Sequence, residues 1–227
     1  MHNRWVEETL STHNIALLGF ADLSEIDADA RRGFRYGVSL AMALTVLPDA
    51  EEASIAYFNE YRRVSAALKE ASAFLTEQIL ARGYDAVSLW LLDRQDEDFR
   101  TSLPFKTLAT RAGLGWIGKS AALVTKEYGS AIRLSGVLTD MPFETGTPVN
   151  TSFCGTCTEC VKHCPGKAIR GSLWDLRSDR DSLLDPHACK RAVIERGKAL
   201  GQTEGACGVC VAVCPWTKRF FMGRHLS

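Results

Sequence analysis

The segment CGTCTECVKHCP, residues 154–165, places four cysteines within eleven residues and ends in proline. Its spacing, Cys154-x2-Cys157-x2-Cys160-x3-Cys164, is that of ferredoxin loops that hold [4Fe–4S] clusters. In two-cluster ferredoxins the first three cysteines of such a run bind one cluster, and the fourth, beside proline, binds the other. The segment therefore predicts two clusters and requires four further cysteine ligands elsewhere in the chain.

The four other cysteines lie between residues 189 and 214. The segment CGVCVAVCP, residues 207–215, repeats the end of the first motif but lacks its first cysteine. Cys189, in DPHACKR, is the one cysteine left to supply that ligand. The expected ligand sets are Cys154, Cys157, Cys160 and Cys214 for one cluster, and Cys164, Cys189, Cys207 and Cys210 for the other. Each of the eight cysteines is then used once.

The cysteines have two other conceivable uses. Zinc could take the pairs Cys154/Cys157 and Cys207/Cys210, since paired Cys-x2-Cys units are typical of zinc sites. This leaves the other four cysteines and both Cys-Pro ends without a role. Four disulfides would need an oxidising compartment and are typical of much smaller chains. We therefore expect two [4Fe–4S] clusters.

The composition excludes several classes of protein. The chain has 227 residues, 46% of them apolar, and its 27 basic residues balance 27 acidic ones. A neutral chain gives no global electrostatic case for nucleic acid or an anionic membrane, and no apolar run is long enough to span a bilayer. Arg31 and Arg32 precede an apolar stretch, as in twin-arginine export signals, but the thirty residues before them contain six acidic ones. We expect a buried strand there and a cytoplasmic protein.

The part before the cysteines predicts a mixed fold. The apolar stripe from Tyr57 to Ile79 recurs every three or four residues, and Gly83 is placed to end that helix. The expected strands are the apolar runs 14–23, 36–47 and 84–92, followed by 121–125 and 131–139. We expect an α/β domain over residues 1–145, and then a ferredoxin-like domain over residues 146–227, giving an α+β or α/β chain overall.

A glycine-rich stretch, RAGLGWIGKSAALV, covers residues 111–124. Gly113, Gly115 and Gly118 permit a tight backbone and the close approach of a flat ligand. The same letters contain G-x-G-x-x-G and G-x-x-x-x-G-K-S. Dinucleotide and P-loop sites, however, need a strand before the glycines and a helix after them. A loop and short helix are expected before this stretch and strands after it, which argues against both.

Together, the segments LPFKTLATRAGLGWIGKSAALV, GSAIRLSGVLTDMP, CGTCTECVKHCPGKAI, ACKR and CGVCVAVCPW make the sequence resemble the epoxyqueuosine reductases. It resembles the corrinoid-dependent reductive dehalogenases more distantly. The resemblance implies a domain of the vitamin-B12-dependent reductase type followed by a two-cluster domain, with cobalamin between them. It also implies an external electron donor of the ferredoxin or flavodoxin type, and a small molecule or modified nucleoside as substrate. By position, the residues implied to line the corrinoid are Arg111, Gly113, Gly115, Trp116, Gly118 and Lys119.

One departure from the family concerns the proton donor. Epoxyqueuosine reductases carry an Asp-Ser/Thr-Ala-Pro motif whose aspartate has that presumed role, whereas Thr101-Ser102-Leu103-Pro104 stands at this position. Threonine cannot act as the acid near neutral pH, and we expect the acidic residues 96–98 to be solvated loop charges. Without that aspartate, the sequence identifies no catalytic residue. Its absence also argues against epoxyqueuosine itself as the substrate. The alternative function is an electron relay to a partner without a corrinoid.

Overall fold

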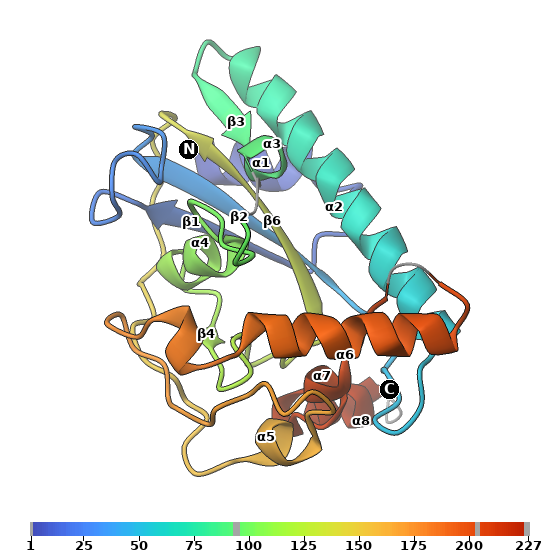
Figure 1. Cartoon of the computed structure of the whole chain (residues 1–227). Coiled ribbons are helices and arrows are strands. Elements are labelled where there is room, and N and C mark those ends of the chain that lie inside the picture. Colours follow the sequence, from blue (N-terminus) through green and yellow to red (C-terminus); the bar gives the residue numbers. More distant parts are fainter. Residues whose placement is uncertain (1, 93–95, 203–204, 225–227) are drawn as a thin grey trace. The chain divides into compact units, whose positions relative to one another are not determined.

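The computed structural model describes residues 2–92, 96–202 and 205–224 (Figure 1). They form two compact units, each assembled from separate parts of the chain. The first, here the sheet unit, comprises Met1–Ala43, Val64–Leu114 and Arg133–Val149. The second, here the cysteine unit, comprises Leu44–Arg63, Gly115–Ile132 and Asn150–Ser227. This division differs from the single boundary expected after residue 145, because two earlier segments pack with the cysteine-rich part.

The sheet unit is built on four strands in the order β1-β2-β6-β3. These are β1 (Leu17–Asp22), β2 (Tyr36–Ala43), β3 (Ala86–Ser88) and β6 (Ile132–Thr139). The pairs β1–β2 and β3–β6 are antiparallel. The expected strand over residues 84–92 is wrong in its second half, where the chain turns into the short helix α3 (Leu89–Leu92). The Ser88 hydroxyl accepts a hydrogen bond from the Trp90 N–H at 3.3 Å, as a helix N-cap does.

Helices lie against both faces of this sheet. Leu108 of α4 (Phe105–Arg111) lies over two strand glycines: a Cβ added at Gly37 or Gly136 would come within 2.6 or 2.3 Å of its methyl groups. On β6, Arg133 donates to the Ser65 hydroxyl of α2 (Ile55–Leu80) at 3.1 Å. Residues 133 and 136 face opposite sides of a strand. The strands are therefore buried on both faces, as their continuous apolar sequences predicted.

The long helix α2 also matches its prediction (Figure 1). Its apolar stripe is buried: Val64 is 2% exposed, and Leu68, Leu75 and Ile79 are fully buried. Gly83 follows the helix with a φ of +83°, a backbone conformation that favours glycine. Among the described residues, neither this helix nor any other combines the length and apolarity that a bilayer crossing requires.

The cysteine unit is made of short elements. They are the hairpin β4 (Trp116–Ile117) and β5 (Leu123–Val124), and the helices α5 (Glu159–His163), η1 (Arg180–Ser182), α6 (Pro186–Ala199), α7 (Val209–Ala212) and α8 (Pro215–Arg224). The segment 44–63 belongs here because Arg196 of α6 donates to the carbonyl oxygens of Asp49 and Glu51 at 3.0 and 3.2 Å. Gly208, before α7, lies so close to this segment that an added Cβ would be 2.5 Å from the Tyr57 ring.

Candidate metal centre

The first cysteine loop is short and ends in a helix. Gly155 has a φ of +53°, and the Cys157 N–H donates to the Cys154 carbonyl at 3.2 Å, so the chain turns tightly between the first two cysteines. Cys160 then lies in α5, whereas Cys164 follows that helix in extended backbone. The change of backbone between these two cysteines separates the fourth cysteine of the motif from the first three.

A cavity of about 120 Å³ lies within the cysteine unit. Its lining includes Cys154, Cys157 and Cys160 together with Cys214, from the second motif, and Cys210. Cys164 is not among the residues that line it. The volume is several times the roughly 30 Å³ of one liquid water molecule, so the cavity has room for a polynuclear centre rather than a single ion. The donor set and the volume fit an iron–sulfur cluster.

The other cysteines group together elsewhere in the unit. Cys189, in α6, lies close enough to Cys164 and Cys207 for their negative charges to raise its thiol pKa, although burial has the larger effect. Burial likewise raises the pKa of Cys207, with Cys164 contributing. Cys210 also has a raised pKa, from burial first and then from Cys207 and Cys189. Cys164, Cys189 and Cys207 therefore lie near one another, and Cys210 lies next to them as well as in the lining of the cavity.

The Cys160 thiol of this site resists ionisation while no metal is bound. Burial first, and then neighbouring Cys154, Cys157 and Cys214, raise its pKa to about 11. A metal binds the thiolate and so displaces this proton. No three His, Cys, Asp or Glu side chains in the described part of the chain are close enough to share one metal ion. The thiols instead surround a larger space.

One cation accompanies the cavity. Lys119 lines it and is only 6% exposed, and its Nζ donates to the Cys157 carbonyl at 2.9 Å. Within the described residues, this lysine forms no ion pair with a carboxylate. A buried charge without a counter-charge is costly. Its position in a cavity lined by five cysteines is therefore suited to a centre that carries negative charge.

The remaining residues of the glycine-rich stretch are held by the chain itself. Arg111 is 3% exposed and donates to the Val149 carbonyl at 2.8 Å. A Cβ on Gly113 would lie 2.7 Å from the Thr147 carbonyl oxygen, and one on Gly115 only 2.2 Å from the Val124 carbonyl oxygen. These glycines thus allow protein backbone to approach, whereas the sequence had suggested a flat ring. Their corrinoid-lining role stays a prediction.

Two further residues of that stretch, Trp116 and Gly118, lie in the cysteine unit. A Cβ on Gly118 would be 3.4 Å from the Cys154 sulfur, and Gly118 lines the cavity. Trp116 is 1% exposed and packs edge-on against Phe153 and Trp216, with ring centroids 5.2 and 5.1 Å away. After Gly118 the chain enters β5, in agreement with the strands expected there. Sequence reasoning missed that this stretch forms a wall of the cysteine cavity.

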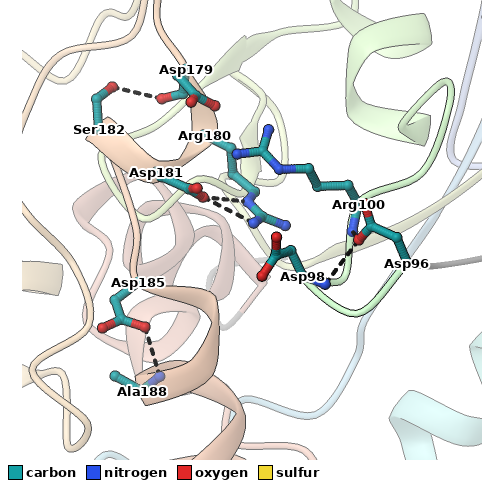
Figure 2. Close-up of polar contacts among 9 residues, drawn as sticks. All are labelled: Asp96, Asp98, Arg100, Asp179, Arg180, Asp181, Ser182, Asp185 and Ala188. Atoms are coloured by element: carbon teal, nitrogen blue, oxygen red, sulfur yellow. Dashed lines mark hydrogen bonds and ion pairs between the residues drawn. The ribbon is translucent and has the colours of Figure 1, made fainter.

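The loop before Thr101 contains the acidic residues nearest to that position in the chain. Asp96 Oδ1 accepts hydrogen bonds from the N–H groups of Asp98 and Arg100 at 3.0 and 2.7 Å (Figure 2). This carboxylate therefore shapes its own loop. In the cysteine unit, the same figure shows Arg180 donating to Asp181 at 2.9 Å.

Comparisons with known proteins agree with this site. Residues 153–217 match the family described as the 4Fe-4S double cluster binding domain. The chain is 31% identical over 154 residues to an epoxyqueuosine reductase of Synechocystis sp., across 63% of this chain and 52% of the relative. It is 37% identical over 116 residues to a tetrachloroethene reductive dehalogenase of Sulfurospirillum multivorans, across 48% of this chain and 23% of that protein. The resemblance seen in the sequence is confirmed.

The fold agrees as well. A crystal structure of selenomethionine-labelled epoxyqueuosine reductase superposes with a TM-score of 0.63 at 20% identity, over 96% of this chain and 66% of that one. The predicted architecture, an α/β part and a double-cluster part, is therefore confirmed. The chain spans about half or less of the length of these two curated relatives. It carries a 4Fe–4S double cluster binding domain and is related to the epoxyqueuosine reductases.

Proposed function

We propose that the chain is an iron–sulfur oxidoreductase whose eight cysteines hold two [4Fe–4S] clusters. One ligand set is Cys154, Cys157, Cys160 and Cys214; the other is Cys164, Cys189, Cys207 and Cys210. The observation that carries the proposal is the presence of Cys214, from the second motif, in the cavity of the first three cysteines. Ligand exchange of this kind is the rule in two-cluster ferredoxins.

The chain's own residues prepare these sites for electron transfer. Bound clusters of this type accept and release single electrons. The cysteines supply thiolate ligands, Trp216 lines the cavity and packs against buried Trp116, and Lys119 places a positive charge beside the cavity. In such a site, a scarcity of polar groups would lower the reduction potential of a cluster, and the fixed cation would raise it.

The acceptor of the electrons is the second part of the proposal. The relatives support a corrinoid, or a substrate bound by the sheet unit, as acceptor. A relay to a partner protein is the second candidate, because Gly113 and Gly115 are occupied by contacts with the chain itself. Thr101 stands where the epoxyqueuosine reductases carry the aspartate that is their presumed proton donor, and threonine supplies no acid there. We therefore do not assign the substrate of these relatives to this chain.

Paired substitutions test the ligand sets. In anaerobically reconstituted protein we expect about eight irons and a broad absorbance near about 400 nm. The double variant Cys154→Ser/Cys214→Ser removes two ligands of one cluster and should keep about half of the iron. The matched variant Cys154→Ser/Cys164→Ser damages both clusters and should lose nearly all of it. The reverse result would show that each loop serves its own cluster, and a colourless zinc protein would overturn the assignment altogether.

A titration with cobalamin separates the two acceptors. If a corrinoid is the acceptor, one equivalent binds and is reduced by the reduced protein, as seen in the cobalamin absorbance. If no cobalamin binds to protein with full iron content, the corrinoid is not the acceptor, and the electron relay to a partner protein becomes the proposed function.

A further inference from the structure

Four basic side chains follow two of the proposed ligands closely in the chain. Lys167 and Arg170 follow Cys164, and Lys190 and Arg191 follow Cys189; all four are exposed. The set Lys167, Arg170, Lys190 and Arg191 is called the basic rim below. Its position matters because both cysteines belong to the same proposed cluster, and the inference rests on that proposed function.

Packing joins the two halves of the basic rim. A Cβ on Gly166 would lie 2.7 Å from the Ala188 carbonyl oxygen and 3.1 Å from the Ala192 Cβ, so the loop after Cys164 lies on the first turns of α6. The Asp185 N–H donates to the Ala168 carbonyl at 2.8 Å, which fixes the start of α6 beside the same loop. The loop with Lys167 and Arg170 therefore lies against the helix that carries Lys190 and Arg191, and the Asp185 carboxylate lies near both Arg170 and Arg191.

The charges of the basic rim are not neutralised by ion pairs. Three neighbouring cations are paired: Lys162 with Glu159 at 3.3 Å, Arg177 with Asp175 at 3.3 Å, and Arg180 with Asp181 at 2.9 Å. Within the described residues, none of the four rim side chains forms such a pair.

One carboxylate lies close to the rim. The carboxylate of Asp185 caps α6 by accepting from the Ala188 N–H at 2.9 Å. Its pKa is lowered chiefly by that hydrogen bond, and then by the charges of Arg191 and Arg170. In a chain without net charge, the rim is a local positive field.

We propose that the basic rim docks an acidic electron-donor protein of the ferredoxin or flavodoxin class. Electron transfer slows steeply with distance, so a donor must approach a segment that holds a cluster ligand, and the rim residues lie close in the chain to two such ligands. Complementary charge speeds such encounters and orients the partners. In the transfer, one electron leaves the donor's reduced centre and enters the cluster; no covalent bond forms or breaks.

An RNA partner fits this surface less well. Surfaces that bind single-stranded nucleic acid combine basic side chains with exposed aromatic rings on which bases stack. Between residues 162 and 191 the one Phe, Tyr or Trp residue is Trp174, which is 7% exposed. The rim offers charge without a stacking platform.

Charge reversal tests the proposal on the iron-loaded full chain. The variant is Lys190→Glu/Arg191→Glu, and Lys167→Glu/Arg170→Glu repeats the test on the facing loop. The matched control, Lys69→Glu/Lys126→Glu, reverses two exposed charges that are not part of the rim. Reduced plant-type ferredoxin serves as the donor, and the bleaching of the cluster absorbance gives the second-order rate constant at several salt concentrations.

We expect each rim variant to be reduced about tenfold more slowly than wild type at low ionic strength, with the difference disappearing at high salt. The control should behave as wild type, and dithionite should reduce all variants equally. Unchanged rates in both rim variants, or an equal loss in the control, would overturn the docking surface. So would rim variants that lose affinity for an RNA stem-loop while ferredoxin reduces them normally. Absence of iron in the wild type would instead overturn the proposed function.

Discussion

Lys119 is the cationic side chain among the residues that line the cysteine cavity. A fixed positive charge favours the state of a neighbouring centre that holds an additional electron. Replacing it, in Lys119→Met, should therefore lower the midpoint potential of one of the two clusters and leave the other nearly unchanged. A redox titration followed by electron paramagnetic resonance measures both.

Two variants control for the loss of packing around Lys119. Lys119→Arg keeps the charge and should restore most of the potential, and Lys126→Met removes an exposed lysine and should change nothing. Equal potentials in Lys119→Met and wild type, at full iron content, would contradict the role assigned to the charge.

Gly115 tests what the glycine-rich stretch does. Because an added Cβ would meet the Val124 carbonyl oxygen at 2.2 Å, Gly115→Ala forces backbone apart and should destabilise the protein by about 2 kcal/mol or more. Thermal unfolding measures the loss, and iron content should fall with it. Gly223→Ala is the matched control, since Gly223 is helical and has open space around it; it should be neutral or slightly stabilising. A Gly115→Ala protein as stable as wild type would show that the hairpin can move aside.

These two residues also mark the limit of sequence reasoning at this scale. The cysteine spacing predicts two ligand sets, because ligand number and loop geometry restrict the solutions. The glycines showed only that something approaches closely. Whether that is a flat ligand or the Val124 carbonyl depends on the tertiary path of β5, which no local pattern encodes.

Within the segment that precedes and begins α2, Glu60 connects a helix to a loop. Its carboxylate accepts from the Thr45 N–H at 3.0 Å, from the Thr45 hydroxyl at 2.7 Å and from Arg63 at 2.8 Å. The hydrogen bond from Arg63 is the largest cause that lowers the pKa of Glu60 from 4.5 to about 2, and the bonds from Thr45 add to it. The carboxylate therefore stabilises the folded state when ionised.

The pH dependence follows from that direction. The stabilisation should be complete above about pH 4.5, the unfolded value, and should be lost as the pH falls towards about 2. We expect Glu60→Gln to cost about 1–2 kcal/mol at pH 7, and the difference from wild type to shrink in acid, as measured by denaturant unfolding. Glu70→Gln, at an exposed position of α2, should show no such trend. A pH-independent difference for Glu60→Gln would mean that packing, and not charge, is lost.

At the scale of elements, periodicity predicted long segments well and short ones poorly. The stripe of α2 and the apolar strands β1, β2 and β6 follow from burial alone. The run 84–92 is equally apolar, yet Ser88 caps α3 in its middle. The hydrogen bond to the Ser88 side chain accompanies the change from strand to helix there. Hydrophobic periodicity does not report such a bond.

Across the whole molecule, the division of the chain was the least predictable feature. Composition changes near residue 145, but packing assigns Leu44–Arg63 and Gly115–Ile132 to the cysteine unit. A fragment of residues 146–227 would lack Lys119 and Gly118 from the cavity and the residues that Arg196 and Gly208 contact. We therefore expect this fragment to retain far less iron than the full chain after the same reconstitution, measured per mole of protein. Equal iron content would show that the cysteine loops are sufficient.

The interleaved segments also have a consequence for biosynthesis. The sheet unit ends at Val149, five residues before the first cysteine of the chain. A ribosome therefore finishes the whole of one unit before it adds any ligand of the metal centre. The hairpin and the Leu44–Arg63 segment are synthesised before the cysteines with which they pack. Delivery of iron and sulfide is thus placed after the synthesis of the sheet unit, once residues 154–214 can enclose what they receive.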